Sequence, residues 1–135
     1  MACDLLGSYS ITGEAYRIED GTDTFRAIGG TAITIRKVGK DFFRYEETEL
    51  VVPPVIGAGT TSPTDPNTLV FSAETQFGHQ LIYVTAAECK RGKAQKILVK
   101  KFLTTQVGGV ILISGTRNEE KQIRICGKCH IKILL

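Results

Sequence analysis

The sequence predicts an all-β domain of about eight mostly antiparallel strands, folded as a barrel or a two-sheet sandwich. β-Branched and aromatic residues occur in short runs, and Gly, Asp and Asn turn signals separate these runs at short intervals. A length of 135 residues is typical of one domain, and 42% hydrophobic with 23% charged residues is an ordinary globular composition. No apolar run approaches the ~18 residues of a membrane-spanning helix, so we expect no membrane association.

Hydrophobic alternation and turn residues together define the expected strands. Glycines at Gly21, Gly39, Gly92 and Gly109 mark tight turns, because glycine readily adopts the positive φ that such turns require. The expected strands are Gly7–Ile18, Thr31–Val38, Phe42–Val52, Thr68–Glu74, Gln80–Cys89, Gln95–Leu103, Val110–Gly115 and Gln122–Leu134.

The segment 53–67 is expected to be a long Pro/Gly/Thr loop. It contains all four prolines of the chain and a single charged residue, and proline cannot donate a sheet hydrogen bond. Loops of this length are either mobile connectors or functional arms. If the loop is an arm, Val55 and Ile56 are the apolar side chains that would dock on a neighbour.

Two segments carry more detailed expectations. Ala94, Leu98 and Phe102 also have helical spacing, so a helix is an alternative to the strand at 95–103. In the last strand, Ile123 to Ile133 alternate with basic residues over eleven positions, which predicts one core face and one basic face.

The spacing of the cysteines suggests a haem or zinc site, but the expected strand geometry disfavours both. Cys126, Cys129 and His130 have the spacing of a c-type haem attachment, and with Cys3 or Cys89 they form a possible zinc set. In one continuous strand Cys126 and Cys129 would point to opposite faces. We therefore expect no metal and no cofactor. The start of the chain has no signal-peptide pattern, so we expect cytoplasmic synthesis without secretion and reduced thiols, with incorporation into a particle as an option.

The remaining candidates for catalysis are weak, and we expect a non-enzymatic protein. His79 has no carboxylate close to it in sequence and is expected at a turn or strand edge. Glu46 and Glu47 should face opposite sides of a strand, so they are expected to be solvated charges and not a paired acid and base. Gly57 and Gly59 lack the third glycine and helix of a dinucleotide site, and no phosphate-binding Gly-Lys-Ser/Thr motif occurs.

Charge is distributed unevenly along the chain, although its net value is only +3. Residues 1–89 hold six Lys+Arg against twelve Asp+Glu, a net of −6, whereas residues 90–135 hold eleven against two, a net of +9. Such asymmetry is informative about partners. The candidate partner-binding residues are Lys90, Arg91, Lys93, Lys96, Lys100, Lys101, Arg124, Lys128, His130 and Lys132, together with Val55 and Ile56.

Three functions fit these patterns. The first is a structural or assembly subunit, for example of a virion, that self-associates as a homo-oligomer through complementary charged surfaces. The second is nucleic-acid binding through segment 90–101 and the last strand, although few aromatic residues accompany the basic ones. The third is a barrel that holds a small apolar ligand against interior Ile, Leu and Phe side chains.

Overall fold

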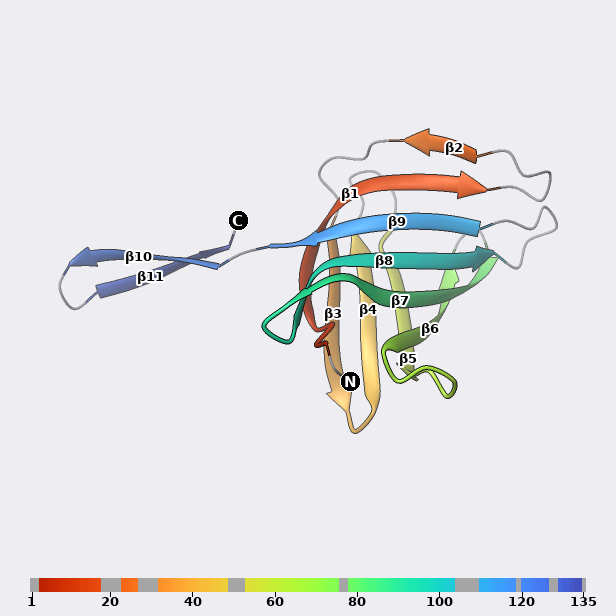
Figure 1. Cartoon of the computed structure of the whole chain (residues 1–135), viewed down its shortest axis with the longest axis horizontal. Helices are drawn as coiled ribbons and strands as arrows, with labels where there is room; N and C mark the ends of the chain where they lie inside the picture. The colour runs from red at the N-terminus through yellow and green to blue at the C-terminus, as the bar shows by residue number, and fades with distance from the viewer. Residues whose placement is uncertain are drawn as a thin grey trace.

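The computed structural model describes residues 3–17, 23–26, 32–48, 53–75, 78–103, 110–118, 120–126 and 129–134. Every element in these ranges is a β-strand (Figure 1). The strands are Gly7–Arg17 (β1), Asp23–Arg26 (β2), Ala32–Gly39 (β3), Phe42–Thr48 (β4), Val55–Thr61 (β5), Thr68–Thr75 (β6), Gly78–Lys90 (β7), Lys93–Leu103 (β8), Val110–Arg117 (β9), Glu120–Cys126 (β10) and Cys129–Leu134 (β11).

Eight antiparallel strands close into a barrel, which confirms the predicted fold class and selects the barrel over the sandwich. The strand order is β1-β3-β4-β5-β6-β7-β8-β9, and β9 pairs back onto β1. Strand β1 pairs with both of its neighbours in the ring. Gly7–Ser10 pair with β3, and Tyr9–Arg17 pair with β9. The short strand β2 pairs with the end of β1, outside the ring. Closure leaves no free sheet edge within the ring itself.

The expected loop at 53–67 is wrong over its first half, because Val55–Thr61 form β5 between β4 and β6. The glycines of this segment serve a close approach of two strands and not a turn. A Cβ at Gly59 would lie 1.8 Å from the carbonyl oxygen of Val70 on β6. The actual connection is residues 62–67, where Asp65 accepts hydrogen bonds from the Asn67 N–H and the Thr68 hydroxyl.

The expectation of a single strand at 122–134 is also wrong. The segment is a hairpin, in which Arg124 lies opposite His130 and Cys126 lies opposite Cys129. Figure 1 shows this hairpin extending away from the barrel. Segment 93–103, in contrast, is a strand as predicted, and the helical alternative is excluded. The strand β2 has no counterpart among the expected strands.

Alternating inward-facing side chains of the ring strands form the core in the described part of the barrel. The buried apolar residues include Leu5, Tyr9, Ile33, Ile35, Phe43, Tyr45, Leu69, Phe71, Ile82, Val84, Ile97, Val99 and Ile113. The aromatic rings of Tyr45 and Phe71 lie 5.4 Å apart in this core. The segment preceding β1 lies at the end of the barrel near the β7–β8 turn, and its Leu5 side chain is buried in the core.

The N-terminal segment is hydrogen-bonded to the turn between β7 and β8. The Asp4 N–H donates to the Gly92 carbonyl (2.7 Å), and the Asp4 carbonyl accepts from the Ala94 N–H (2.9 Å). This contact brings Cys3 next to Cys89, and the two form a disulfide with a Cα–Cα distance of 6.2 Å. The expectation of reduced thiols is therefore wrong for these two residues. Sequence spacing gave no sign of the pairing, because 86 positions separate them.

Arg117, near the end of β9, joins this segment to the barrel wall. Its Nε donates to the Ala94 carbonyl (2.6 Å), and its Nη2 donates to the Leu6 carbonyl (2.8 Å) and to the Tyr9 hydroxyl oxygen (2.9 Å). The guanidinium carbon also lies 5.0 Å from the centre of the Tyr9 ring. The Tyr9 hydroxyl in turn donates to the Leu5 carbonyl (2.7 Å). One side chain thus satisfies the polar groups that the chain exposes while crossing the end of the barrel.

Candidate functional site

Two strands of the barrel place a charged side chain among inward-facing apolar ones. On β4, Glu47 follows Phe43 and Tyr45 at alternate positions, and on β8, Lys101 follows Ile97 and Val99. Side chains at alternate positions share one face of a strand. Glu47 and Lys101 consequently point into the barrel, where they are only 2% and 4% exposed. The expectation that Glu47 is a solvated charge is wrong for this reason.

The two charges pair with each other across the interior. Lys101 Nζ lies 2.7 Å from Glu47 Oε1, and the Tyr45 hydroxyl donates to the same oxygen at 2.5 Å. Strands β4 and β8 are four positions apart in a ring of eight, so they form opposite walls. The ion pair therefore spans the barrel. Taking two charges out of water costs several kcal/mol each, so a pair of this kind is weak evidence for stability and needs another explanation.

Gln80 adds a further buried polar side chain to the interior, on the strand adjacent to that of Lys101. It is 6% exposed on β7, and its buried Oε1 has no hydrogen-bond partner within the described ranges. Ile82 lies opposite Lys101 in the sheet, so Gln80 is the next inward-facing residue along β7. The side chains of Glu47, Lys101, Tyr45 and Gln80 are called the interior polar cluster below. An unpartnered buried carbonyl oxygen costs ~1–3 kcal/mol.

Sequence reasoning missed the interior polar cluster, although one signal was available. The alternation of Ile97 and Val99 with polar residues already placed Lys101 on the inner face. Lys101 was instead grouped with the exposed basic residues of segment 90–101. Its neighbours in that segment are exposed: Lys90, Arg91, Lys93, Lys96 and Lys100.

The exposed basic residues lie at the β7–β8 turn and on the outer face of β8. Both Lys90 and Lys96 have Glu88 as a partner, with N–O distances of 3.8 and 3.7 Å. Lys100 lies over the Phe102 ring at 5.6 Å, and Phe102 contacts Tyr83 edge to face. The outer face thus holds two aromatic side chains beside the basic ones, where the sequence indicated only Phe102. Self-association and nucleic-acid binding through these residues both stay predictions.

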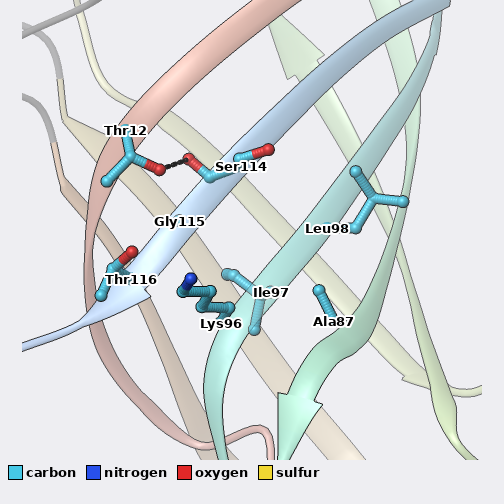
Figure 2. Close-up of a pocket in the computed structure, with 8 residues that line it drawn as sticks. All are labelled: Thr12, Ala87, Lys96, Ile97, Leu98, Ser114, Gly115 and Thr116. Carbon is cyan, nitrogen blue, oxygen red and sulfur yellow. Dashed lines mark hydrogen bonds between the residues drawn. The ribbon is translucent and has the colours of Figure 1, made fainter.

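A shallow groove crosses the outer face of the barrel beside Lys96 (Figure 2). Its volume is about 480 Å³. Figure 2 shows Thr12 of β1 pointing toward Ser114 of β9, whose carbonyl oxygen accepts a hydrogen bond from the Thr12 hydroxyl at 3.2 Å. The remaining lining residues are Ala87, Lys96, Ile97, Leu98, Gly115 and Thr116. The groove is open, and it presents hydroxyl groups with one lysine that is paired to Glu88.

The other predicted site residues are separated from this surface. Val55 and Ile56 lie in strand β5 and not in an arm, with Val55 packed against the core and Ile56 46% exposed. Their contact with a partner stays a prediction. Arg124 lies on β10, and His130 and Lys132 lie on β11, so a hairpin replaces the expected continuous basic face. Lys128 and the side chains of this hairpin lie outside the described residues.

The metal expectations rest partly on geometry that the structure changes. The strand ends at Cys126, so the continuous strand that separated Cys126 from Cys129 does not exist. Cys3 and Cys89 are joined to each other and are not free to complete a zinc set. Within the described ranges, no three His, Cys, Asp or Glu side chains are grouped to hold a metal ion.

His79 is the second residue of β7, at the beginning of the strand as expected, and its partner strand is β6. It also has a carboxylate neighbour that the sequence did not indicate. Glu74 lies directly opposite His79 in the sheet, and His79 Nδ1 lies 2.5 Å from Glu74 Oε1. The hairpin between β6 and β7 creates this pairing from residues five positions apart.

Comparison with protein-family models, with curated proteins and with solved structures finds no match for this chain. In the described part of the chain, no helix has the length and apolar character to cross a membrane.

Proposed function

We propose that the barrel binds one small amphipathic molecule, whose polar group contacts the interior polar cluster. The observation that carries this proposal is the buried Oε1 of Gln80, which has no hydrogen-bond partner among the described residues and lies on the strand adjacent to Lys101 of the buried ion pair. Eight strands give an interior that side chains can just fill or that can hold one small ligand. Buried polar groups that cost stability are typical of sites built for a ligand.

The interior polar cluster is surrounded by apolar side chains that suit the body of such a ligand. Ile82 and Ile111 flank Lys101 on the adjacent strands, and Ala73 lies opposite Gln80. Ligand sites of proteins commonly combine an apolar lining with a few polar groups that fix orientation. A molecule with an apolar chain or ring and one polar end matches this lining.

The charges of the interior polar cluster select a neutral polar group. Lys101 and Glu47 already neutralise each other, and separating them would leave a buried unpaired charge at a cost of ~3–5 kcal/mol. A carboxylate ligand would have to compete with Glu47 for Lys101. A hydroxyl or amide N–H needs only to donate to Gln80 Oε1. The favoured ligand class is therefore an uncharged amphiphile, such as a fatty alcohol or amide.

The test compares 1-dodecanol with dodecanoate as competitors of a fluorescent apolar probe. We expect the alcohol to bind about tenfold more tightly, which corresponds to one buried hydrogen bond of ~1.4 kcal/mol. Gln80→Leu should reduce this preference to near unity. Gln95→Leu, a glutamine substitution on β8 that leaves Gln80 in place, is the matched control and should retain the preference. No competition by either compound, or a tighter fit of dodecanoate, would contradict the proposal.

A further inference from the structure

Three side chains on the outer face of the β6–β7 hairpin form a hydrogen-bonded series. Ser72 Oγ lies 3.1 Å from His79 Nε2, and His79 Nδ1 lies 2.5 Å from Glu74 Oε1. Antiparallel register produces this arrangement, because Glu74 is opposite His79 and Ser72 is two residues before Glu74 on the same face. Ser72 and Glu74 are exposed, so the series is open to solvent.

The carboxylate of Glu74 determines which nitrogen of His79 carries the proton. An ionised carboxylate can only accept, so the proton of a neutral imidazole lies on Nδ1. Nε2 then holds a lone pair and accepts from the Ser72 hydroxyl. A hydroxyl, a base and a group that orients the base are the parts of an activated serine nucleophile, which is recognised by geometry and not by sequence position.

The neighbouring strands β5 and β4 provide an apolar surface and a cation on the same outer face as Ser72. Ala58 of β5 lies opposite Ser72, and Arg44 of β4 lies opposite Ala58. The strand spacing puts Arg44 about 10 Å from Ser72 along the sheet, with only the methyl group of Ala58 between them. Arg44 pairs with Glu46 through Nη2 (3.3 Å), but its buried Nε has no hydrogen-bond partner in the part of the chain that the structure describes. Beside Ala58, Ile56 is a large apolar side chain that is 46% exposed.

We propose that this face of β4–β7 hydrolyses short-chain carboxylic esters through an acyl-enzyme at Ser72. The Ser72 oxygen forms a bond to the ester carbonyl carbon while its proton passes to His79 Nε2. The carbon–oxygen bond to the leaving alcohol then breaks, and His79 gives its proton to that alcohol. Water attacks the acyl-serine with His79 again as the base, which releases the carboxylic acid and restores the serine hydroxyl.

Each residue has a defined role in this reaction. Ser72 is the nucleophile and His79 the general base, whereas Glu74 is a positioning residue that acts through His79. Arg44 offers a positive charge to the oxyanion of the tetrahedral intermediate, in place of a backbone oxyanion hole. Ile56 and Ala58 favour a short apolar acyl group. This activity uses the outer face of the barrel and is independent of ligand binding in the interior.

The experiment is covalent labelling of the intact protein with a fluorophosphonate, with the modified residue mapped by mass spectrometry. We expect one label per chain at Ser72 and a matching burst of p-nitrophenol from p-nitrophenyl acetate. His79→Gln should slow labelling at Ser72 about 100-fold, the range typical of general-base catalysis. Ser72→Ala should abolish the burst. Ser114→Ala, which removes another exposed serine on the outer face of β9, should leave both unchanged.

The role of Glu74 has a separate readout in the ring nitrogens of His79. In Glu74→Gln, nitrogen NMR should show loss of the Nδ1–H tautomer together with slower labelling at Ser72. Labelling spread over several serines, or a Ser72 rate that is the same in His79→Gln, would overturn the proposal. Circular dichroism of each variant confirms that the barrel is folded when labelling is measured.

Discussion

The ammonium group of Lys101 lies 2.7 Å from the carboxylate of Glu47, although the two residues come from opposite walls of the barrel. The two side chains form an ion pair across the interior, and the Tyr45 hydroxyl donates a hydrogen bond to the same carboxylate oxygen. Removing either charge leaves the other buried and unpaired, whereas removing both leaves no unpaired charge in the interior.

The first prediction is a strongly non-additive double-mutant cycle at these positions. Lys101→Met and Glu47→Leu should each lower the free energy of unfolding by ~3–5 kcal/mol. The double variant should lie within ~2 kcal/mol of the parent protein, because no charge is left unpaired. Urea denaturation measures all four stabilities. Additive losses would mean that the two charges do not interact.

The strands of the barrel could be predicted from the sequence wherever alternation was regular and turns held glycine. The strand around Gly57 and Gly59 was not predicted, because the glycine and proline content of segment 53–67 is typical of a loop. Whether a glycine serves a turn or a close approach to another strand depends on tertiary contacts, here with Val70 and Phe71 of β6. The sequence prediction also missed the strand break after Cys126, because the alternation of Ile123 to Ile133 with polar residues stays regular and gives no sign of a break.

The candidate sites were less predictable than the strands because they depend on strands that meet only on closure. Alternation could have placed Lys101 inside, yet nothing in the sequence could identify Glu47, 54 positions away, as its partner. Pairing of His79 with Glu74 requires the register of the β6–β7 hairpin, which a shift by one residue would destroy. The disulfide likewise requires the N-terminal segment to cross the end of the barrel.

The second prediction concerns Arg117, whose planar guanidinium donates to Ala94, Leu6 and Tyr9 at once. A lysine has one terminal nitrogen and cannot reproduce this fork. Arg117→Lys should lower the free energy of unfolding by ~2–4 kcal/mol, since buried acceptors lose their donors. Arg36→Lys, at an exposed position of β3, should change it by less than ~0.5 kcal/mol. Equal effects of the two substitutions in urea denaturation would contradict this role.

The third prediction is a loss of stability in alkali that depends on Tyr9. Burial raises the pKa of Tyr9 to about 12 from the ordinary 10.0, although the neighbouring Arg117 acts in the opposite direction. Between these values the folded state keeps a proton that the unfolded state loses, so stability falls as pH rises from about 10 to about 12. The expected loss is about 2–3 kcal/mol, because each pKa unit corresponds to ~1.4 kcal/mol. Unfolding of Tyr9→Phe, measured over the same pH range, should lack this component; an identical alkaline slope in both proteins would refute the assignment.

The fourth prediction concerns the Cys3–Cys89 disulfide, which encloses most of the barrel strands. Its removal by Cys3→Ala with Cys89→Ala should lower the free energy of unfolding by ~2–5 kcal/mol, mainly because the unfolded chain gains freedom. The parent protein in reducing buffer should show a similar loss. The matched control, Cys126→Ala with Cys129→Ala, should leave the Cys3–Cys89 link intact. If a non-reduced digest contains no peptide linking Cys3 to Cys89, the connection is incorrect.

The fifth prediction separates a glycine required by packing from one that is not. At Gly59 a Cβ would lie 1.8 Å from the Val70 carbonyl oxygen, so β5 and β6 cannot accept alanine there without moving apart. At Gly13 an added Cβ meets nothing within 4 Å. Gly59→Ala should therefore cost at least ~3 kcal/mol or prevent folding, because it breaks strand pairing in the barrel wall. Gly13→Ala should stay within ~1 kcal/mol of the parent protein in thermal and urea unfolding, and a comparable loss at both positions would show that strand contact does not determine the glycine at Gly59.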